Sequence, residues 1–199
     1  LFPYTTALPI INNFPGVRKY GIRTIKACIS GSAPLPVEVQ EAFEKLTKGK
    51  LVEGYGLTEA SPITHANPLG KNRRLGTIGV PLPSTEAVIV DLMTGRKEVE
   101  PGQIGELAIR GPQVMMGYWK NEAATKEVIT EDGWLLTGDV AQMDDDGFCR
   151  IISRKADMWY PEKGGKEPAF PRDVEEVIYE IPQVKEVVVV AVAGHPFAF

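Results

Sequence analysis

A strand–helix–strand pattern near the amino end constrains the fold more than any other feature of the sequence. Residues 22–30, IRTIKACIS, alternate in part between apolar and polar side chains, as a strand does. After the turn GSAPLP, residues 37–50 carry apolar side chains at helical spacing, and KLVEGYG then begins a second strand at residue 50. Because parallel strands need a crossover and these connections are short, we predict a βαβ unit with a parallel sheet.

Charged and small residues of this segment support the helix. Glu41 with Lys45, and Glu44 with Lys48, are separated by four residues in the order that stabilises a helix. Gly49 is expected to cap the carboxyl end, where glycine tolerates a left-handed backbone.

Residues 67–152 are rich in glycine and in short strands. The expected strands lie in the segments EAVIVD, GELAIRG, GWLLTGDVAQMD and GFCRIIS. The DDDG sequence at 144–147 predicts a hairpin turn, and a calcium loop is disfavoured because Gln142 and Ser153 occupy its first and last ligand positions. Residues 121–129 predict a helix capped by Asn121.

The last part of the chain has a helix and strand pattern of its own. Residues 171–181, PRDVEEVIYEI, have proline at a helix start and apolar side chains at helical spacing. VKEVVVVAVAG at 184–194 is a β-branched run that predicts a buried strand. The predicted fold class is therefore α/β, mixed with α+β, and this part is the start of a small α+β domain.

Composition narrows the class of protein. With 43% hydrophobic and 24% charged residues the chain is typical of globular proteins, and its net charge of −4 argues against a nucleic-acid surface.

The basic cluster of Lys71, Arg73 and Arg74 is interpreted as a solvated loop. Cys28 and Cys149 lie in apolar runs and are expected to be buried, reduced thiols of a cytoplasmic protein. The two histidines are far apart, so no zinc site is expected.

Neither end of the chain has the features of a finished terminus. LFPYTTALPII lacks a basic start and a long apolar core, so it does not predict a signal peptide, and no apolar run approaches the ~20 residues that span a bilayer. We expect the chain to be an internal or C-terminal fragment of a longer protein.

The segment GYGLTEAS, residues 54–61, is the strongest candidate for a binding loop. Gly54 and Gly56 permit a close approach of backbone, and Tyr55 offers a flat face to an aromatic base. Thr58 can donate to a phosphate oxygen, and Glu59 is a hard oxygen ligand for Mg²⁺. A turn with a buried tyrosine and a solvated glutamate explains the same residues, and composition alone does not decide between the two.

Three other segments carry candidate groups. The glycine of GSAPLP precedes a helix whose free N–H groups suit an anion, although a plain turn is the better interpretation of this segment alone. Asp139 in TGDVA can accept from a ribose diol or be an ordinary turn aspartate. Arg154 in SRKAD can reach a phosphate or belong to a charged linker.

The order of these segments resembles the adenylate-forming (AMP-binding) superfamily, which includes acyl-CoA synthetases, firefly luciferase and the adenylation domains of nonribosomal peptide synthesis. The motifs are GSAP, GYGLTEAS, GELAIRGPQVMMGYW, GWLLTGD and GFCRIISRKADM, and they run nearly end to end. Within the superfamily the chain looks most like bacterial and archaeal medium- and long-chain fatty acyl-CoA ligases. The resemblance implies that a fatty acid is activated with MgATP and transferred from AMP to coenzyme A.

The resemblance also implies roles for the motif residues. Thr58 would contact the α-phosphate, Glu59 would bind Mg²⁺, and Arg154 would fix ribose and phosphate. Tyr55 would stack on the adenine base. The other implied nucleotide and coenzyme A contacts are Gly31, Ser32 and Ala33 on the adenine side, Gly54 and Gly56 beside Tyr55, Asp139 on the ribose hydroxyls, and Gly164 and Gly165 on coenzyme A.

The implied domain organisation has four parts. Residues 1–66 form the βαβ portion of the AMP-binding large domain, 67–153 its small β-barrel-like subdomain, 154–156 a hinge, and 157–199 an incomplete small domain. Ala156 stands where the family usually has Lys or Asp. The family's phosphate loop and its catalytic lysine are absent from the chain, so we expect the isolated chain to be inactive.

The expected partners are a fatty acid, ATP and coenzyme A, with peripheral membrane contact and a homodimer as further expectations for the parent protein. Alternative functions are a fatty acyl-AMP ligase, an aryl-CoA ligase, or a non-catalytic nucleotide-binding module of the same fold.

Overall fold

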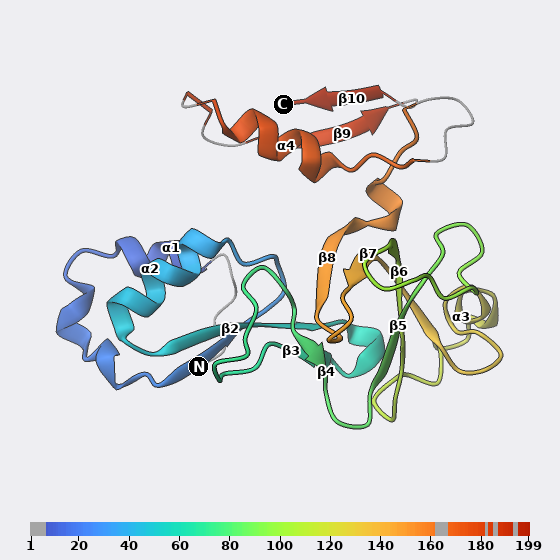
Figure 1. Ribbon diagram of the computed structural model, residues 1–199, viewed down its shortest axis with the longest axis horizontal. Coiled ribbons are helices and arrows are strands. Elements are labelled where there is room, and N and C mark those ends of the chain that lie inside the picture. Colours follow the sequence, from blue (N-terminus) through green and yellow to red (C-terminus); the bar gives the residue numbers. More distant parts are fainter. Residues whose placement is uncertain (1–6, 162–166, 182, 185–186, 193–194) are drawn as a thin grey trace.

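The computed structural model describes residues 7–161, 167–181, 183–184, 187–192 and 195–199. Within these residues the strands form three sheets, two with four strands and one with two. Figure 1 shows the βαβ part and the antiparallel sheet side by side, with the last helix and hairpin connected through the segment after β8. The predicted mixed α/β class is confirmed.

The predicted βαβ unit is present. Strand β1 (Ala27–Ser30), helix α2 (Val37–Thr47) and strand β2 (Lys50–Gly56) follow one another, and β1 pairs with β2 in parallel. The first strand is shorter than predicted, because residues 22–24 form a 3₁₀ turn and only the last four residues of IRTIKACIS join the sheet.

The end of α2 corrects the prediction for Gly49. The cap is Lys48, which has a left-handed backbone with φ 66°. Gly49 serves a close approach instead, since a Cβ there would lie 2.5 Å from the carbonyl oxygen of Ile25. The predicted Glu44–Lys48 pair is replaced by an ion pair between Glu44 and Arg73.

One apolar core joins α1 (Leu8–Asn13) to the βαβ unit. It contains buried side chains from α1, β1, the turn after β1, α2 and β2, namely Leu8, Cys28, Leu35, Phe43 and Leu51. Strand β2 continues into the first sheet by pairing with β3 (Ile63–Ala66), which pairs with β4 (Val80–Pro81).

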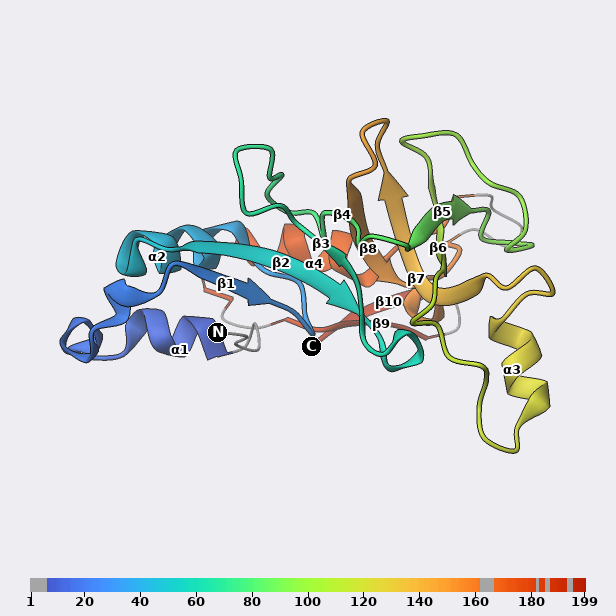
Figure 2. The same cartoon turned by 90° about the horizontal axis from the view of Figure 1, so that it is seen from below.

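The second sheet contains the strands predicted in residues 67–152. They are β5 (Glu86–Val90), β6 (Ile104–Arg110), β7 (Leu135–Met143) and β8 (Cys149–Arg154), all antiparallel. The DDDG hairpin is confirmed, with Gly147 N–H donating to the Asp144 carbonyl at 2.9 Å. Helix α3 (Glu122–Val128) lies at the far end of this sheet in Figure 2, and its predicted cap is confirmed, since Asn121 accepts from the Ala124 N–H.

Main-chain contacts connect the first two sheets. Ile78 N–H donates to the Cys149 carbonyl, and Cys149 N–H donates to the Gly79 carbonyl, both at 2.9 Å. The sheets therefore meet beside the start of β8. Cys28 and Cys149 are both buried and free, and burial raises the pKa of each thiol.

The basic cluster is only partly the solvated loop that we predicted, since Lys71 is exposed but both arginines form ion pairs. Arg73 forms a bidentate pair with Glu44, and Arg74 pairs with Asp144 and Asp146. The Arg74 guanidinium also lies 4.3 Å from the centre of the Phe148 ring. Ion pairs thus connect the loop after β3 to α2 through Arg73 and to the DDDG hairpin through Arg74.

The last part consists of α4 (Pro171–Tyr179), β9 (Val189–Val192) and β10 (His195–Ala198), and β9 pairs with β10 antiparallel. The helix is confirmed, but the prediction of a buried strand is wrong on one face. Val188, Val190 and Val192 are 58%, 41% and 55% exposed, while Val187 and Val189 are buried. Strand alternation therefore places only every second valine in the core.

Short 3₁₀ helices lie between these elements: η2 (Val17–Tyr20), η3 (Ile22–Thr24), η4 (Thr58–Ala60) and η5 (Lys155–Asp157). Among the described residues, no helix combines the length and apolar character needed to cross a bilayer.

Candidate active site

A cavity of about 430 Å³ lies where the end of β2, the first half of β7 and the loop before α3 meet. Four residues with predicted roles line it: Gly56, Thr58, Glu59 and Arg154. The other lining residues are Leu57, Glu106, Tyr118, Glu127, Val128, Leu135, Leu136, Thr137, Gly138 and Lys155. Segments that are far apart in sequence therefore converge on one site.

The glycines of GYGLTEAS allow the chain to fold back tightly after β2. A Cβ on Gly56 would lie 2.0 Å from the Pro62 carbonyl oxygen, and one on Gly54 would lie 2.8 Å from the Ile29 side chain. Leu57 N–H donates to the same Pro62 carbonyl at 2.8 Å. This close return forms η4 and directs its first two residues, Thr58 and Glu59, into the cavity.

A buried carboxylate lies beside the cavity with two partners. The Tyr55 hydroxyl donates to Asp139 Oδ2, and Arg154 Nε lies 3.0 Å from Oδ1. Burial raises the pKa of Asp139, and both partners oppose this shift. Burial and the charge of Asp139 raise the pKa of Tyr55, so its hydroxyl stays protonated as a donor. A carboxylate oxygen can accept more than one hydrogen bond, so these two contacts do not use all the lone pairs of Asp139.

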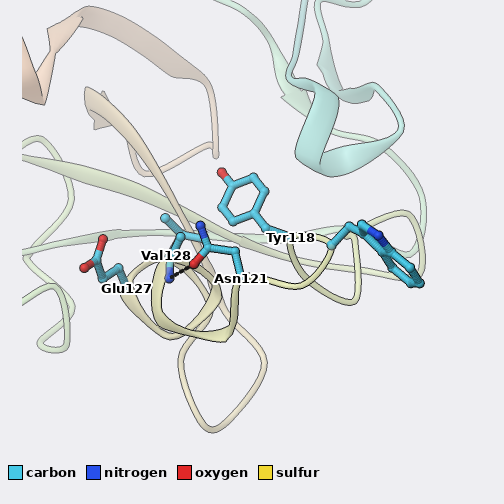
Figure 3. Close-up of a pocket in the computed structure, with 6 residues that line it drawn as sticks. Tyr118, Asn121, Glu127 and Val128 are labelled. Carbon is cyan, nitrogen blue, oxygen red and sulfur yellow. Dashed lines mark hydrogen bonds between the residues drawn. The ribbon is translucent and has the colours of Figure 1, made fainter.

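Tyr118 is a lining residue that the sequence did not indicate. Its hydroxyl donates to Glu59 Oε1 at 2.8 Å, and this hydrogen bond raises the pKa of Tyr118. Figure 3 shows the ring projecting from the loop before α3, and the Met115 N–H of that loop donates to the Glu59 carbonyl at 2.8 Å. The side chain and the backbone of Glu59 are thus both held by this loop.

The oxygen groups of the cavity suit magnesium that is bound together with substrate phosphates. Mg²⁺ usually takes one or two carboxylates and completes its shell with phosphate and water. Glu59 supplies one carboxylate and Thr58 a hydroxyl, both on the cavity wall. In the part of the chain that the structure describes, no three acidic, histidine or cysteine side chains gather into a group that could hold a metal ion.

The remaining predicted residues lie at different distances from the cavity. Gly31 approaches β2 closely, since a Cβ there would lie 3.2 Å from the Gly54 carbonyl oxygen. Ser32 has a left-handed backbone with φ 75° and, like Ala33, belongs to the turn before α2. The predicted roles of this turn stay predictions. Gly164 and Gly165 lie outside the described residues.

Glu106 and Lys155 are further groups that sequence reasoning missed. Both line the cavity, and Lys155 Nζ lies 2.5 Å from Glu106 Oε2. The available signal was a carboxylate inside the strand-like segment GELAIRG, which is unusual for a sheet interior.

Residues 7–119, more than half of the chain, match the family model described as AMP-binding enzyme. The chain belongs to the AMP-binding enzyme family. This confirms the resemblance drawn from the order of the motifs.

Curated relatives support the same assignment. The chain is 47% identical over 193 residues to a long-chain-fatty-acid–CoA ligase of Bacillus subtilis (strain 168), covering 96% of the chain and 34% of that protein. It is 38% identical over 195 residues to the mitochondrial medium-chain acyl-CoA ligase ACSF2 of Bos taurus, covering 96% of the chain and 31% of that protein. The chain thus spans about a third of the length of these relatives.

Solved structures agree with the fold. ATP-bound MatB from Rhodopseudomonas palustris has a TM-score of 0.83 at 30% identity, with 96% of this chain and 37% of that chain covered. The anthranilate CoA ligase AuaEII in complex with anthranoyl-AMP has a TM-score of 0.81 at 27% identity, with 99% and 37% covered.

Proposed function

We propose that the protein containing this chain is an AMP-forming long-chain-fatty-acid–CoA ligase, and that the chain supplies part of its ATP site. The observation that carries the proposal is the convergence of Thr58, Glu59 and Arg154 on one cavity beside the buried carboxylate of Asp139. The names of the curated relatives support a fatty acid as the acid substrate.

The proposed reaction has two steps. In the first, a carboxylate oxygen of the fatty acid forms a bond to the α-phosphorus of ATP, and the bond to pyrophosphate breaks. In the second, the sulfur of coenzyme A bonds to the acyl carbon, the thiol proton goes to solvent, and AMP leaves. No protein nucleophile is needed, so positioning and charge neutralisation supply the rate.

The cavity residues suit these tasks. The Thr58 hydroxyl can donate to an α-phosphate oxygen, and the Arg154 guanidinium can neutralise phosphate charge or bond the ribose. Asp139 can accept from the ribose hydroxyls through its remaining lone pairs. Glu59 would hold Mg²⁺, which when bound neutralises charge on the phosphate oxygens.

The test is fatty-acid-dependent exchange of labelled pyrophosphate into ATP by the full-length gene product, without coenzyme A. Exchange is expected with medium- and long-chain fatty acids, and added coenzyme A should then give the thioester. A panel that includes malonate, benzoate and anthranilate separates this activity from ligases of other acids. Absence of exchange with every acid overturns the proposal, and exchange without thioester formation points to a different acceptor.

A further inference from the structure

Glu106 is a buried carboxylate in the lining of the cavity. It lies in β6, is 3% exposed, and pairs in register with Val140 of β7. A carboxylate in this position is costly unless hydrogen bonds or a cation compensate its desolvation.

Two groups from different segments meet this carboxylate. Gly138 N–H donates to Oε1 at 3.0 Å, and Lys155 Nζ lies 2.5 Å from Oε2. Gly138 has a left-handed backbone with φ 71°, so the first contact holds a turn that only glycine adopts readily. The second contact holds the first residue of η5.

These contacts form a closed ring that includes Asp139 and Arg154, the candidate ribose-binding residues. Gly138 precedes Asp139, and Lys155 follows Arg154. Asp139 and Arg154 are cross-strand partners in β7 and β8, and they form their own ion pair at 3.0 Å. The ring therefore runs from Glu106 through the Gly138 turn to Asp139, across to Arg154, and through Lys155 back to Glu106.

We propose that Glu106 is a positioning residue, which fixes Asp139 and Arg154 relative to each other so that they receive the ribose of ATP. This inference rests on the proposed function for the identity of the ligand. Glu106 acts through these neighbours, because its two oxygens are occupied by Gly138 and Lys155, while Asp139 and Arg154 make the contacts with the nucleotide.

The experiment compares binding of ATP with binding of 2′,3′-dideoxy-ATP to the full-length protein by titration calorimetry. Glu106→Gln removes the charge that holds Lys155, and Lys155→Met removes the cation from a side chain that is 32% exposed. The matched control is Glu86→Gln, which breaks an exposed ion pair with Arg110 in the same sheet.

Loss of a charge-assisted contact is expected to reduce the preference for ATP over the dideoxy analogue by about ten- to hundredfold. Both single variants should show this reduction, with nearly unchanged affinity for the analogue. The double variant should lose no more of the preference for ATP than either single variant, because each of the three variants breaks the same ring. The control should keep the wild-type preference.

An unchanged preference in both single variants overturns the inference, and so does an equal loss of affinity for both nucleotides, which would give Glu106 a structural role only. If Glu106→Gln does not fold, Lys155→Met carries the same test. If the wild-type protein prefers ATP to the dideoxy analogue and yet exchanges no pyrophosphate, the proposed function is refuted. The variants would still test the ring.

Discussion

Replacing Glu53 with glutamine is expected to stabilise the protein at pH 8 and to change its stability little at pH 5. Glu53 lies in β2 directly before the GYG segment and is 9% exposed. Its Oε1 accepts from the Leu35 N–H at 3.1 Å. Burial raises the pKa of this carboxyl from 4.5 to about 7, against the opposing effects of that hydrogen bond and of the Arg172 charge.

The size and sign of the effect follow from linkage between proton binding and folding. Between pH 4.5 and about 7 the folded protein keeps a proton on Glu53 that the unfolded chain has lost. The contribution of Glu53 to the unfolding free energy of the wild type is therefore fully present below pH 4.5. It is lost as the pH rises through about 7. The difference between the two pKa values corresponds to about 3 kcal/mol, of which about 2 to 3 kcal/mol is lost between pH 5 and pH 8.

Glutamine can accept from Leu35 as the carboxyl does, but it cannot ionise. Urea unfolding of variant and wild type at several values between pH 5 and pH 8 gives the difference in unfolding free energy at each pH. That difference should increase by about 2 to 3 kcal/mol across the range. Glu41→Gln, an exposed change on the neighbouring helix, is the control and should show no such trend. A Glu53→Gln difference that is independent of pH would refute the reasoning.

Three other changes test separate parts of the structure. Glu59→Gln should raise the magnesium concentration needed for half-maximal pyrophosphate exchange by about tenfold, and an unchanged magnesium dependence would remove Glu59 from the metal site. Phe43→Ala should lower the unfolding free energy by about 3 to 5 kcal/mol in urea titrations, because Phe43 is fully buried in the core beside α1. Burial lowers the pKa of His65 from 6.5 to about 4, so the folded protein loses stability as the pH falls across this range. His65→Asn should make this loss smaller. The unfolding free energies of the two proteins are compared in the Glu53→Gln background.

Predictions from local sequence patterns were the most successful. The helix α3 and its Asn121 cap, and the DDDG hairpin, depend on contacts between residues a few positions apart, and each has a recognisable composition. The Lys48 cap shows the limit of such patterns. Glycine is the residue expected at such a cap. Here, however, glycine is needed at position 49 because the carbonyl of Ile25, which belongs to another segment, approaches closely.

Contacts between distant segments could not be predicted in the same way. The interpretation of the basic cluster as a solvated loop missed the ion pairs of Arg73 and Arg74, because their carboxylate partners lie on α2 and on the DDDG hairpin, which composition does not bring together. Glu106 was missed for the same reason, since a strand pattern gives no indication that Gly138 and Lys155 will meet its carboxylate.

Tyr55 and Asp139 show how the structure changes the interpretation of residues that the sequence had identified. They were assigned to separate tasks, one to the base and the other to the ribose. The Tyr55 hydroxyl donates to Asp139 Oδ2, and its ring makes an edge contact with His65 at 6.0 Å between centres. The tyrosine orients the carboxylate while Arg154 holds the other oxygen. The proposed contacts with the base and with the ribose therefore share one hydrogen-bonded unit, and we expect a change at either residue to act on both.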